Sequence, residues 1–235
     1  MATSSKSALI SIFTTLLSLV VIARPVVAQS YNAAGNFSST SNPNGAWSYG
    51  WSYGVGGTFH SDVTNSLAYN GGSLSGWLGN ESGSSYIPYI LHNGTASPVT
   101  IAFTTYQPGQ LALQPGDSNE VGIVRWTAPF SGTFTINATF SGLSALGDSA
   151  DVHILHNGTS LFSSTVTGSP DPAPFSGIQS VLAGDIIDFV VGNGNGNPNE
   201  DTTALSAILV PEPATLNLAA LGLGCLFALR FRKKK

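Results

Sequence analysis

Short apolar runs separated by turn residues make up the pattern of the chain between residues 29 and 209. In the clearest run, residues 133–140, phenylalanine, isoleucine and alanine alternate with threonine and asparagine. A period of two places the apolar side chains on one face of a strand. No long segment shows the 3.6-residue period of a helix. The pattern predicts an all-β domain, an antiparallel β-sandwich with the threonine face of this strand in water.

Two Asn-Gly pairs predict hairpins in this domain. The same six residues, ILHNGT, occur at Ile90–Thr95 and at Ile154–Thr159. An Asn-Gly pair between apolar runs is typical of a two-residue hairpin turn. We expect returning strands at residues 98–106 and 161–166. The repeated sextet is explained either by a duplicated strand unit or by two hairpins that share favoured turn chemistry.

A row of aromatic residues is the first candidate ligand-binding feature. Trp47, Tyr49, Trp51 and Tyr53 alternate with serine and glycine, so all four rings fall on one face of a strand. Burial is the simpler interpretation, because large aromatic side chains are mostly buried. Four such rings are bulky for a sandwich interior about 10 Å thick. The alternative interpretation is therefore a platform that stacks on sugar faces.

The N-terminus is a predicted targeting segment. Lys6 precedes an apolar run at residues 8–23, and Val26–Ala28 supplies small residues before Gln29. This order is typical of a secretory signal peptide cleaved after Ala28. A membrane anchor is the alternative, although the run is short for a membrane span.

Charge and cysteine content narrow the function of the domain. Between residues 29 and 210 there are eleven acidic residues and one basic residue, Arg125, so the net charge is −10, whereas the whole chain carries −4. Nucleic-acid binding depends on lysine and arginine, and we exclude it. The single cysteine, Cys225, lies in the C-terminal segment. The domain therefore has no disulfide and no thiolate chemistry.

Motifs for catalysis are absent from the sequence. It contains no Gly-x-Ser-x-Gly, no His-Glu-x-x-His and no glycine-rich phosphate loop. Asp151 and His153 share a predicted face and His156 follows, but a zinc site needs three or four converging ligands. Asp185 and Asp188 would suit a glycosidase only at the right separation in space. We predict a protein that is not an enzyme.

The loop at residues 192–201 raises the question of a metal. Its asparagine, aspartate and glutamate oxygens are of the type that calcium prefers. Their spacing fits neither the EF-hand loop nor the nonapeptide repeat, and Asn-Gly runs are ordinary turn formers. We predict no cofactor and no metal site, with calcium at this loop as the alternative.

The C-terminal segment, residues 210–235, has three parts in a fixed order. The motif Val210-Pro-Glu-Pro-Ala-Thr215 comes first, an apolar run at Ala214–Leu229 follows, and a basic tail fills residues 230–235. This order resembles the PEP-CTERM sorting signal of exported proteins of Gram-negative bacteria. The basic tail favours a cytoplasmic location, which places the domain outside. The run of about 16 residues is near the lower limit for a membrane span.

The resemblance implies a route for the protein. It implies export, transient anchoring in the inner membrane by a transmembrane helix at residues 214–229, and release to the cell surface or the extracellular space. The sorting motif, Pro211, Glu212 and Pro213, would be recognised by an exosortase, a membrane thiol protease. The resemblance also implies association with exopolysaccharide and the biofilm matrix. A permanent anchor without processing is the alternative.

The domain is also similar to exported bacterial jelly-roll modules. The similarity rests on Arg125–Pro129, Gly132–Phe134, a strand that ends in Asn-Gly, and Gly184-Asp185, in this order. Carbohydrate-binding modules and trimeric jelly rolls of the tumour-necrosis-factor type share this strand chemistry, and a fold does not fix a function. Our hypothesis is a non-catalytic matrix protein that contacts polysaccharide, with the exosortase and the secretion machinery as further partners. The alternatives are a glycan-active enzyme and a structural protein that self-associates through sheet edges or the aromatic row.

Overall fold

The computed structural model describes residues 29–62, 73–79, 87–146, 149–194 and 196–213. The predicted signal peptide, transmembrane helix and basic tail lie outside these residues. Strands occupy the described part of the chain: β1 (Tyr31–Asn32), β2 (Trp47–Tyr53), β3 (His60–Ser61), β4 (Ser75–Leu78), β5 (Tyr89–His92), β6 (Val99–Ile101), β7 (Thr104–Tyr106), β8 (Leu111–Gln114), β9 (Glu120–Thr127), β10 (Gly132–Gly142), β11 (Ser149–His156), β12 (Thr159–Thr167), β13 (Pro172–Val181), β14 (Ile186–Gly192) and β15 (Thr203–Pro211). Nowhere in these ranges does a helix reach the length and apolarity needed to cross a membrane.

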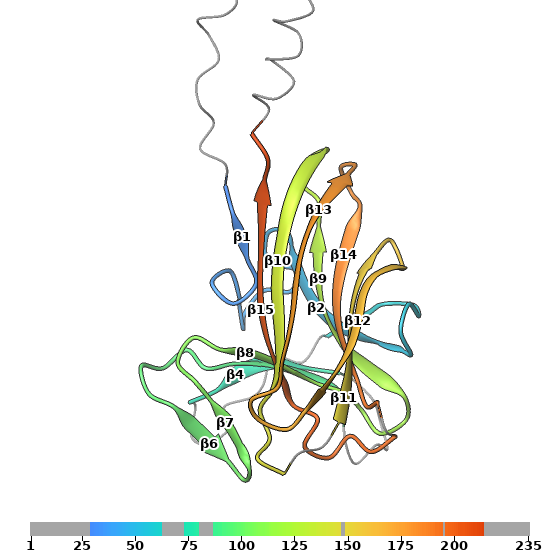
Figure 1. Ribbon diagram of the computed structural model, residues 1–235. Helices are drawn as coiled ribbons and strands as arrows, with labels where there is room; N and C mark the ends of the chain where they lie inside the picture. Colours follow the sequence, from blue (N-terminus) through green and yellow to red (C-terminus); the bar gives the residue numbers. More distant parts are fainter. Residues whose placement is uncertain (1–28, 63–72, 80–86, 147–148, 195, 214–235) are drawn as a thin grey trace, which may run out of the picture.

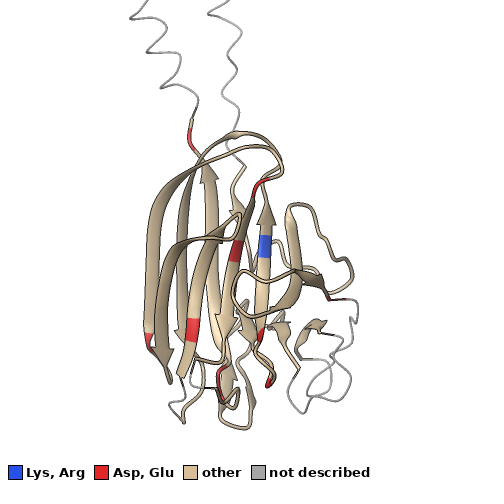
Figure 2. Ribbon diagram, turned by 90° about the vertical axis from the view of Figure 1, so that its right-hand side faces the viewer, with Lys and Arg blue, Asp and Glu red and all other residues tan. Residues whose placement is uncertain are grey.

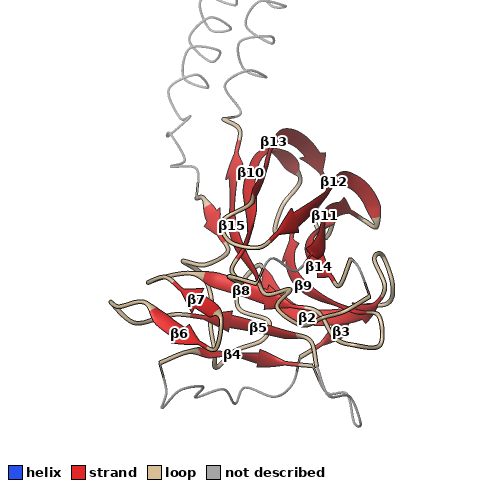
Figure 3. Cartoon of the chain, turned by 60° about the horizontal axis from the view of Figure 1, so that its bottom comes forward, coloured by secondary structure: helices blue, strands red, loops and turns tan. Residues whose placement is uncertain are grey.

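Two antiparallel sheets pack face to face (Figure 1). The first sheet has the order β13-β10-β15-β8-β5-β4, with β1 paired to β15, and the second has the order β12-β11-β14-β9-β2-β3. Strands β6 and β7 form a separate two-stranded sheet beside β8 (Figure 3). The predicted fold class, an all-β antiparallel sandwich, is confirmed.

One face of β10 forms part of the core of the sandwich, as the alternation of residues 133–140 predicts. Phe134, Ile136 and Phe140 of β10 are at most 1% exposed, and they join residues of both sheets in one apolar cluster. The threonines and Asn137 between them lie on the outer face of the first sheet, where they are partly or fully exposed. The prediction that the threonine side faces water is confirmed. The physical reason is that a shift of one residue in the strand register would expose the apolar face and bury the threonines.

The two ILHNGT sextets fold differently. At the second, β11 pairs with β12, and both turn residues have positive φ, 50° at Asn157 and 79° at Gly158, as a type I′ hairpin requires. The hairpin prediction is wrong at the first sextet. There β5 pairs with β4 and β8, and residues 98–106 fold into β6 and β7, which pair with each other.

The last strand continues past the predicted end of the domain at residue 209. Val210 pairs with Thr135 and Pro211 pairs with Phe134 of β10, and Pro211 is buried. The folded sandwich therefore includes the first residues of the sorting motif.

Candidate functional site

The structure separates the four rings of the aromatic row. Trp47, Tyr49 and Trp51 are 1%, 0% and 5% exposed, whereas Tyr53 is 53% exposed. The rings do fall on one face of β2, as alternation predicts, but most of that face points into the sandwich. Tyr49 stacks on Trp77 of the first sheet, with ring centroids 6.5 Å apart. The row is therefore not a four-ring platform on the surface, because three of its rings are buried.

Tyr53 lies where β2 passes beyond this interior. Its ring contacts Trp51 edge to face, at 5.1 Å between centroids, and Trp51 in turn stacks on the exposed ring of His60 at 4.4 Å. Of the four predicted binding residues, Tyr53 alone presents its ring to solvent. One exposed ring with a histidine beside it is a much smaller surface than the predicted row.

A shallow groove of about 480 Å³ lies on the outer face of the first sheet, over β13, β10 and β15. Strand register arranges its lining in two rows across these strands. One row is Ser176, Asn137 and Ile208, and the next is Pro174, Thr139 and Ser206. The groove volume falls within the usual range for small-ligand sites, about 300 to 1,000 Å³.

The groove is lined by neutral groups. Three hydroxyl groups and one amide face solvent, and the remaining lining is apolar. The Ser176 hydroxyl donates to Asn137 Oδ1 at 2.7 Å, which leaves the Asn137 amide nitrogen directed away from that contact. Alternation in the sequence indicated that residues 133–139 face water, but it could not indicate which strands flank β10. The groove residues were therefore missed by sequence reasoning.

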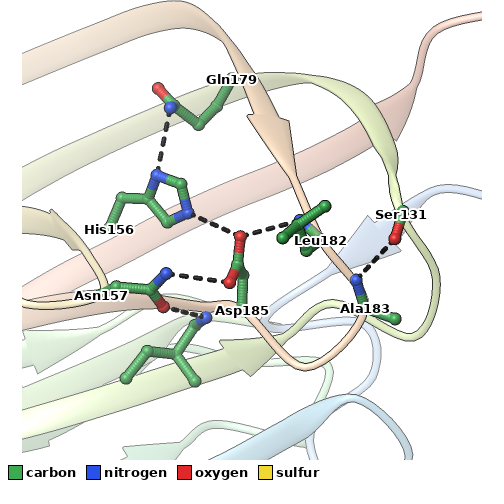
Figure 4. Close-up of polar contacts among 8 residues, drawn as sticks. Ser131, His156, Asn157, Gln179, Leu182, Ala183 and Asp185 are labelled. Carbon is green, nitrogen blue, oxygen red and sulfur yellow. Dashed lines mark hydrogen bonds and ion pairs between the residues drawn. The ribbon is translucent and has the colours of Figure 1, made fainter.

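A chain of side-chain hydrogen bonds links the two sheets at the end of the sandwich shown in Figure 4. Gln179 Nε2 of β13 donates to His156 Nδ1 at 3.1 Å, which assigns the ring proton to Nε2. His156 Nε2 then donates to Asp185 Oδ2 at 3.2 Å. The Asn157 amide donates to Asp185 Oδ1 at 2.9 Å. Both ring nitrogens of His156 are occupied within the protein, so the ring has no free position for a substrate proton.

The same contacts explain the acidity of Asp185. The backbone N–H of Leu182, 2.8 Å from Oδ2, and the amide of Asn157 hold the pKa of this carboxyl below its ordinary value. Hydrogen bonds to the ionised form favour that form. Asp185 therefore fastens the β13–β14 turn to the β11–β12 turn as an anion.

The other carboxylate of the glycosidase hypothesis, Asp188, is held by arginine. Arg125 of β9 donates from Nε to Oδ1 at 2.7 Å and from an Nη to Oδ2 at 2.8 Å, and the Phe59 ring lies over the guanidinium with its centroid 4.0 Å away. In the ribbon of Figure 2, the blue basic position of the described chain lies next to a red acidic position on the neighbouring strand. A bidentate pair of this kind neutralises Asp188 and is a poor arrangement for a general acid or base.

The predicted metal-ligand candidates do not converge. His153 Nε2 lies 2.7 Å from Asp151 Oδ2, so these two share a face as predicted, and this hydrogen bond and the Gly194 N–H lower the pKa of Asp151. His156 instead contacts Asp185. In the loop at residues 192–201, Glu200 Oε2 accepts from the Ser144 hydroxyl at 2.8 Å. Within the ranges that the structure describes, no three histidine, cysteine, aspartate or glutamate side chains form a cluster suited to a metal ion.

The sorting motif is partly docked on the sheet. The Glu212 N–H donates to the Thr133 carbonyl at 2.8 Å, and the Thr135 hydroxyl donates to the Glu212 carboxylate. Pro211 is buried and Pro213 is exposed. Two of the three motif residues are thus held against β10, and the chain leaves the domain at the third.

Comparison with known families confirms the predicted sorting signal at the C-terminus. Residues 209–235 match the family described as the PEP-CTERM protein-sorting motif. The chain therefore carries a PEP-CTERM motif, which indicates an exported protein sorted to the cell surface and processed by an exosortase. No protein with a curated description matches the sequence.

Solved structures with a similar fold are distant. They include CBM51 from Clostridium perfringens GH95 in complex with methyl-galactose, at 12% identity and a TM-score of 0.37, over 77% of this chain and 99% of that chain. A family 35 carbohydrate binding module from Clostridium thermocellum has 10% identity and a TM-score of 0.30, over 52% and 90%. Rabbit GITRL has 18% identity and a TM-score of 0.25, over 39% and 72%. These similarities concern the β-sandwich in general and identify no binding residue in this chain.

Proposed function

We propose that this exported protein is a non-catalytic, polysaccharide-binding component of the cell surface or extracellular matrix. The observation that carries the proposal is the neutral groove over β13, β10 and β15. Its lining residues come from three adjacent strands, so the backbone holds them in a fixed arrangement before a ligand binds. Pre-arranged groups lower the entropy cost of association.

The chemistry of the groove suits an uncharged glycan. Hydroxyl groups of Ser176, Thr139 and Ser206 and the amide of Asn137 both donate and accept hydrogen bonds, as sugar hydroxyls do. Pro174 and Ile208 supply apolar surface for the C–H faces of a sugar ring. The acidic domain, with a net charge of −10, would repel a polyanion, so we expect a neutral polysaccharide rather than a uronic-acid polymer.

The proposal that the protein is not an enzyme rests on the engaged state of its acidic and basic groups. His156 uses both ring nitrogens within the Gln179–Asp185 chain, and Arg125 binds both oxygens of Asp188. We propose likewise that the protein needs no cofactor. Equal melting temperatures in calcium and in a chelator would support that proposal. A higher melting temperature in calcium would instead indicate a bound ion, for which the loop at residues 192–201 is the candidate site.

Affinity electrophoresis of the chain, extracted in a non-ionic detergent, through gels that contain the host's own exopolysaccharide fractions tests the binding proposal. We expect a neutral fraction to retard the wild type. Asn137→Ala with Ser206→Ala should weaken binding about tenfold, since two hydrogen bonds contribute roughly 0.5–1.5 kcal/mol each.

The matched control is Ser180→Ala, an exposed serine on β13 outside the groove, and it should leave the mobility unchanged. Unchanged mobility of the wild type in every fraction would refute polysaccharide binding. Equal retardation of the wild type and the groove variant would show that the groove is not the site. Release of reducing ends from a fraction would support the glycan-active alternative.

A further inference from the structure

The two ends of the described chain lie at the same end of the sandwich. Strand β1 pairs with the last part of β15, with Tyr31 opposite Leu209. Figure 1 shows β1 entering and β15 leaving at this end. The β9–β10 connection at residues 128–131 and the β13–β14 connection at residues 182–185 lie at the same end. We call it the tail end of the domain.

Very little chain separates the tail end from the apolar run of the sorting signal. Among the residues that the structure describes, the last backbone hydrogen bond to the sheet is that of the Glu212 N–H with the Thr133 carbonyl, and the apolar run begins at Ala214. Two residues of extended chain reach about 7 Å. The headgroup region on each side of a bilayer is about 5 to 8 Å thick. When the apolar run lies in lipid, the tail end of the domain must therefore lie at the headgroups.

Two large apolar side chains are exposed at the tail end. Phe130 is 45% exposed and Leu182 is 69% exposed, one in each of the two connections. The connections are fastened together, because the Ala183 N–H donates to Ser131 Oγ at 2.9 Å (Figure 4). In addition, the Gly184 N–H donates to the Ala128 carbonyl at 2.8 Å. The two connections that carry Phe130 and Leu182 are therefore held next to each other.

The charges near these side chains do not favour an electrostatic contact with lipid. The carboxylates at this end, Asp185 and Glu212, are engaged by Leu182 N–H and Asn157 and by Thr135. The one basic residue of the domain, Arg125, is paired with Asp188. An apolar contact is what remains, and phenylalanine and leucine are side chains that enter the membrane interface.

We propose that the tail end of the domain docks on the bilayer while the chain is anchored, with Phe130 and Leu182 inserted at the boundary between headgroups and acyl chains. This inference rests on the anchored state of the sorting route. Docking fixes the long axis of the sandwich relative to the membrane and turns the β6–β7 end away from it. It also holds the sorting motif at the membrane surface, where a membrane protease acts.

Depth measurements on the full chain in phosphatidylcholine vesicles test the proposal. A fluorophore is attached at Ala183→Cys, or at Ala145→Cys as the matched position at the opposite end, each in a Cys225→Ser background. Quenching by lipids that carry a headgroup nitroxide is then measured. We expect strong quenching at position 183 and little at position 145. Phe130→Ser with Leu182→Ser should lower the quenching at position 183 several-fold, while Phe103→Ser with Leu146→Ser, the exposed apolar pair of the opposite end, should not.

A label on Cys225 of the otherwise unaltered chain distinguishes anchoring of the apolar run from docking of the domain. A fluorophore on this native cysteine reports whether the apolar run enters lipid. If acyl-chain nitroxides quench it while position 183 is quenched no more than position 145, anchoring holds and docking is refuted. If Cys225 is not quenched, the anchored state fails and docking fails with it.

Discussion

A buried carboxyl group, Asp62, gives the most quantitative prediction for this domain. Asp62 is 2% exposed, and neither carboxyl oxygen has a hydrogen-bond partner among the described residues. The neighbouring Asn42 amide donates instead to the backbone carbonyls of Asp62 and Tyr49, at 2.9 and 2.7 Å. Burial raises the pKa of Asp62 from its ordinary value of 3.8 to about 8, because an ion loses its hydration there.

The sign of the pH dependence follows from proton binding. Between about pH 4 and about pH 8 the folded state keeps the proton on Asp62 and the unfolded state does not. The free energy of unfolding is therefore highest below the unfolded pKa and falls as the pH rises toward the folded pKa. Each pH unit in this window removes about 1.4 kcal/mol. From pH 5 to pH 7 the wild type should lose about 3 kcal/mol from this one group.

Asp62→Asn tests this reasoning, because it keeps the shape of the side chain and removes the titration. The assay is chemical unfolding of the wild type and the variant at pH 5 and pH 7. The difference between the two proteins should change by about 3 kcal/mol in favour of the variant as the pH rises. The pKa of His92 is lowered by burial, and its contribution cancels in this comparison because both proteins contain it.

Asp117→Asn, at an exposed turn, is the matched control and should leave the pH dependence unchanged. A pH-independent difference between the wild type and Asp62→Asn would refute the reasoning. It would mean that the Asp62 carboxyl is hydrated or paired in solution.

Three further predictions concern the turns and the sorting motif. Thr135→Val removes the hydrogen-bond donor to Glu212, which should weaken the attachment of the sorting motif to β10 by about 1 kcal/mol. Cleavage of the C-terminal segment, followed by pulse-chase, should then become about fivefold faster, whereas equal rates would show that the attachment of the motif to β10 does not limit processing. Gly158→Ala places a side chain at a φ of 79° and should cost about 1 to 2 kcal/mol in unfolding free energy. Gly94→Ala, at ordinary φ, should not, and equal costs would contradict the assigned turn. Asp185→Asn should flatten the loss of stability as the pH falls below about 4, because a depressed pKa contributes stability that acid removes; an unchanged acid limb of the unfolding curve would contradict this.

Local pattern was sufficient for the fold class and for single strands. Alternation in β10 predicted which face is buried, since a strand has only two faces and one of them must pack on the core. The order of motif, apolar run and basic tail predicted the sorting signal, because that signal is read as a linear segment. Features of this kind depend on neighbours in the sequence.

Pairing between distant strands decided what the pattern left open. The sextet ILHNGT forms a hairpin at Asn157, but at Asn93 the side chain is buried and donates to the Ser97 and Tyr106 carbonyls, so the same letters give a different chain path. Competition from tertiary contacts overrides the preference of a turn sequence.

Local sequence patterns predicted an exported, acidic, all-β domain with a C-terminal sorting signal. Contacts between distant strands place Trp47, Tyr49 and Trp51 in the interior, form the groove over β13, β10 and β15, and hold Glu212 on β10. One cause accounts for all three features. Burial and hydrogen bonding between segments far apart in the chain depend on which strands become neighbours, and side-chain periodicity specifies faces and not neighbours.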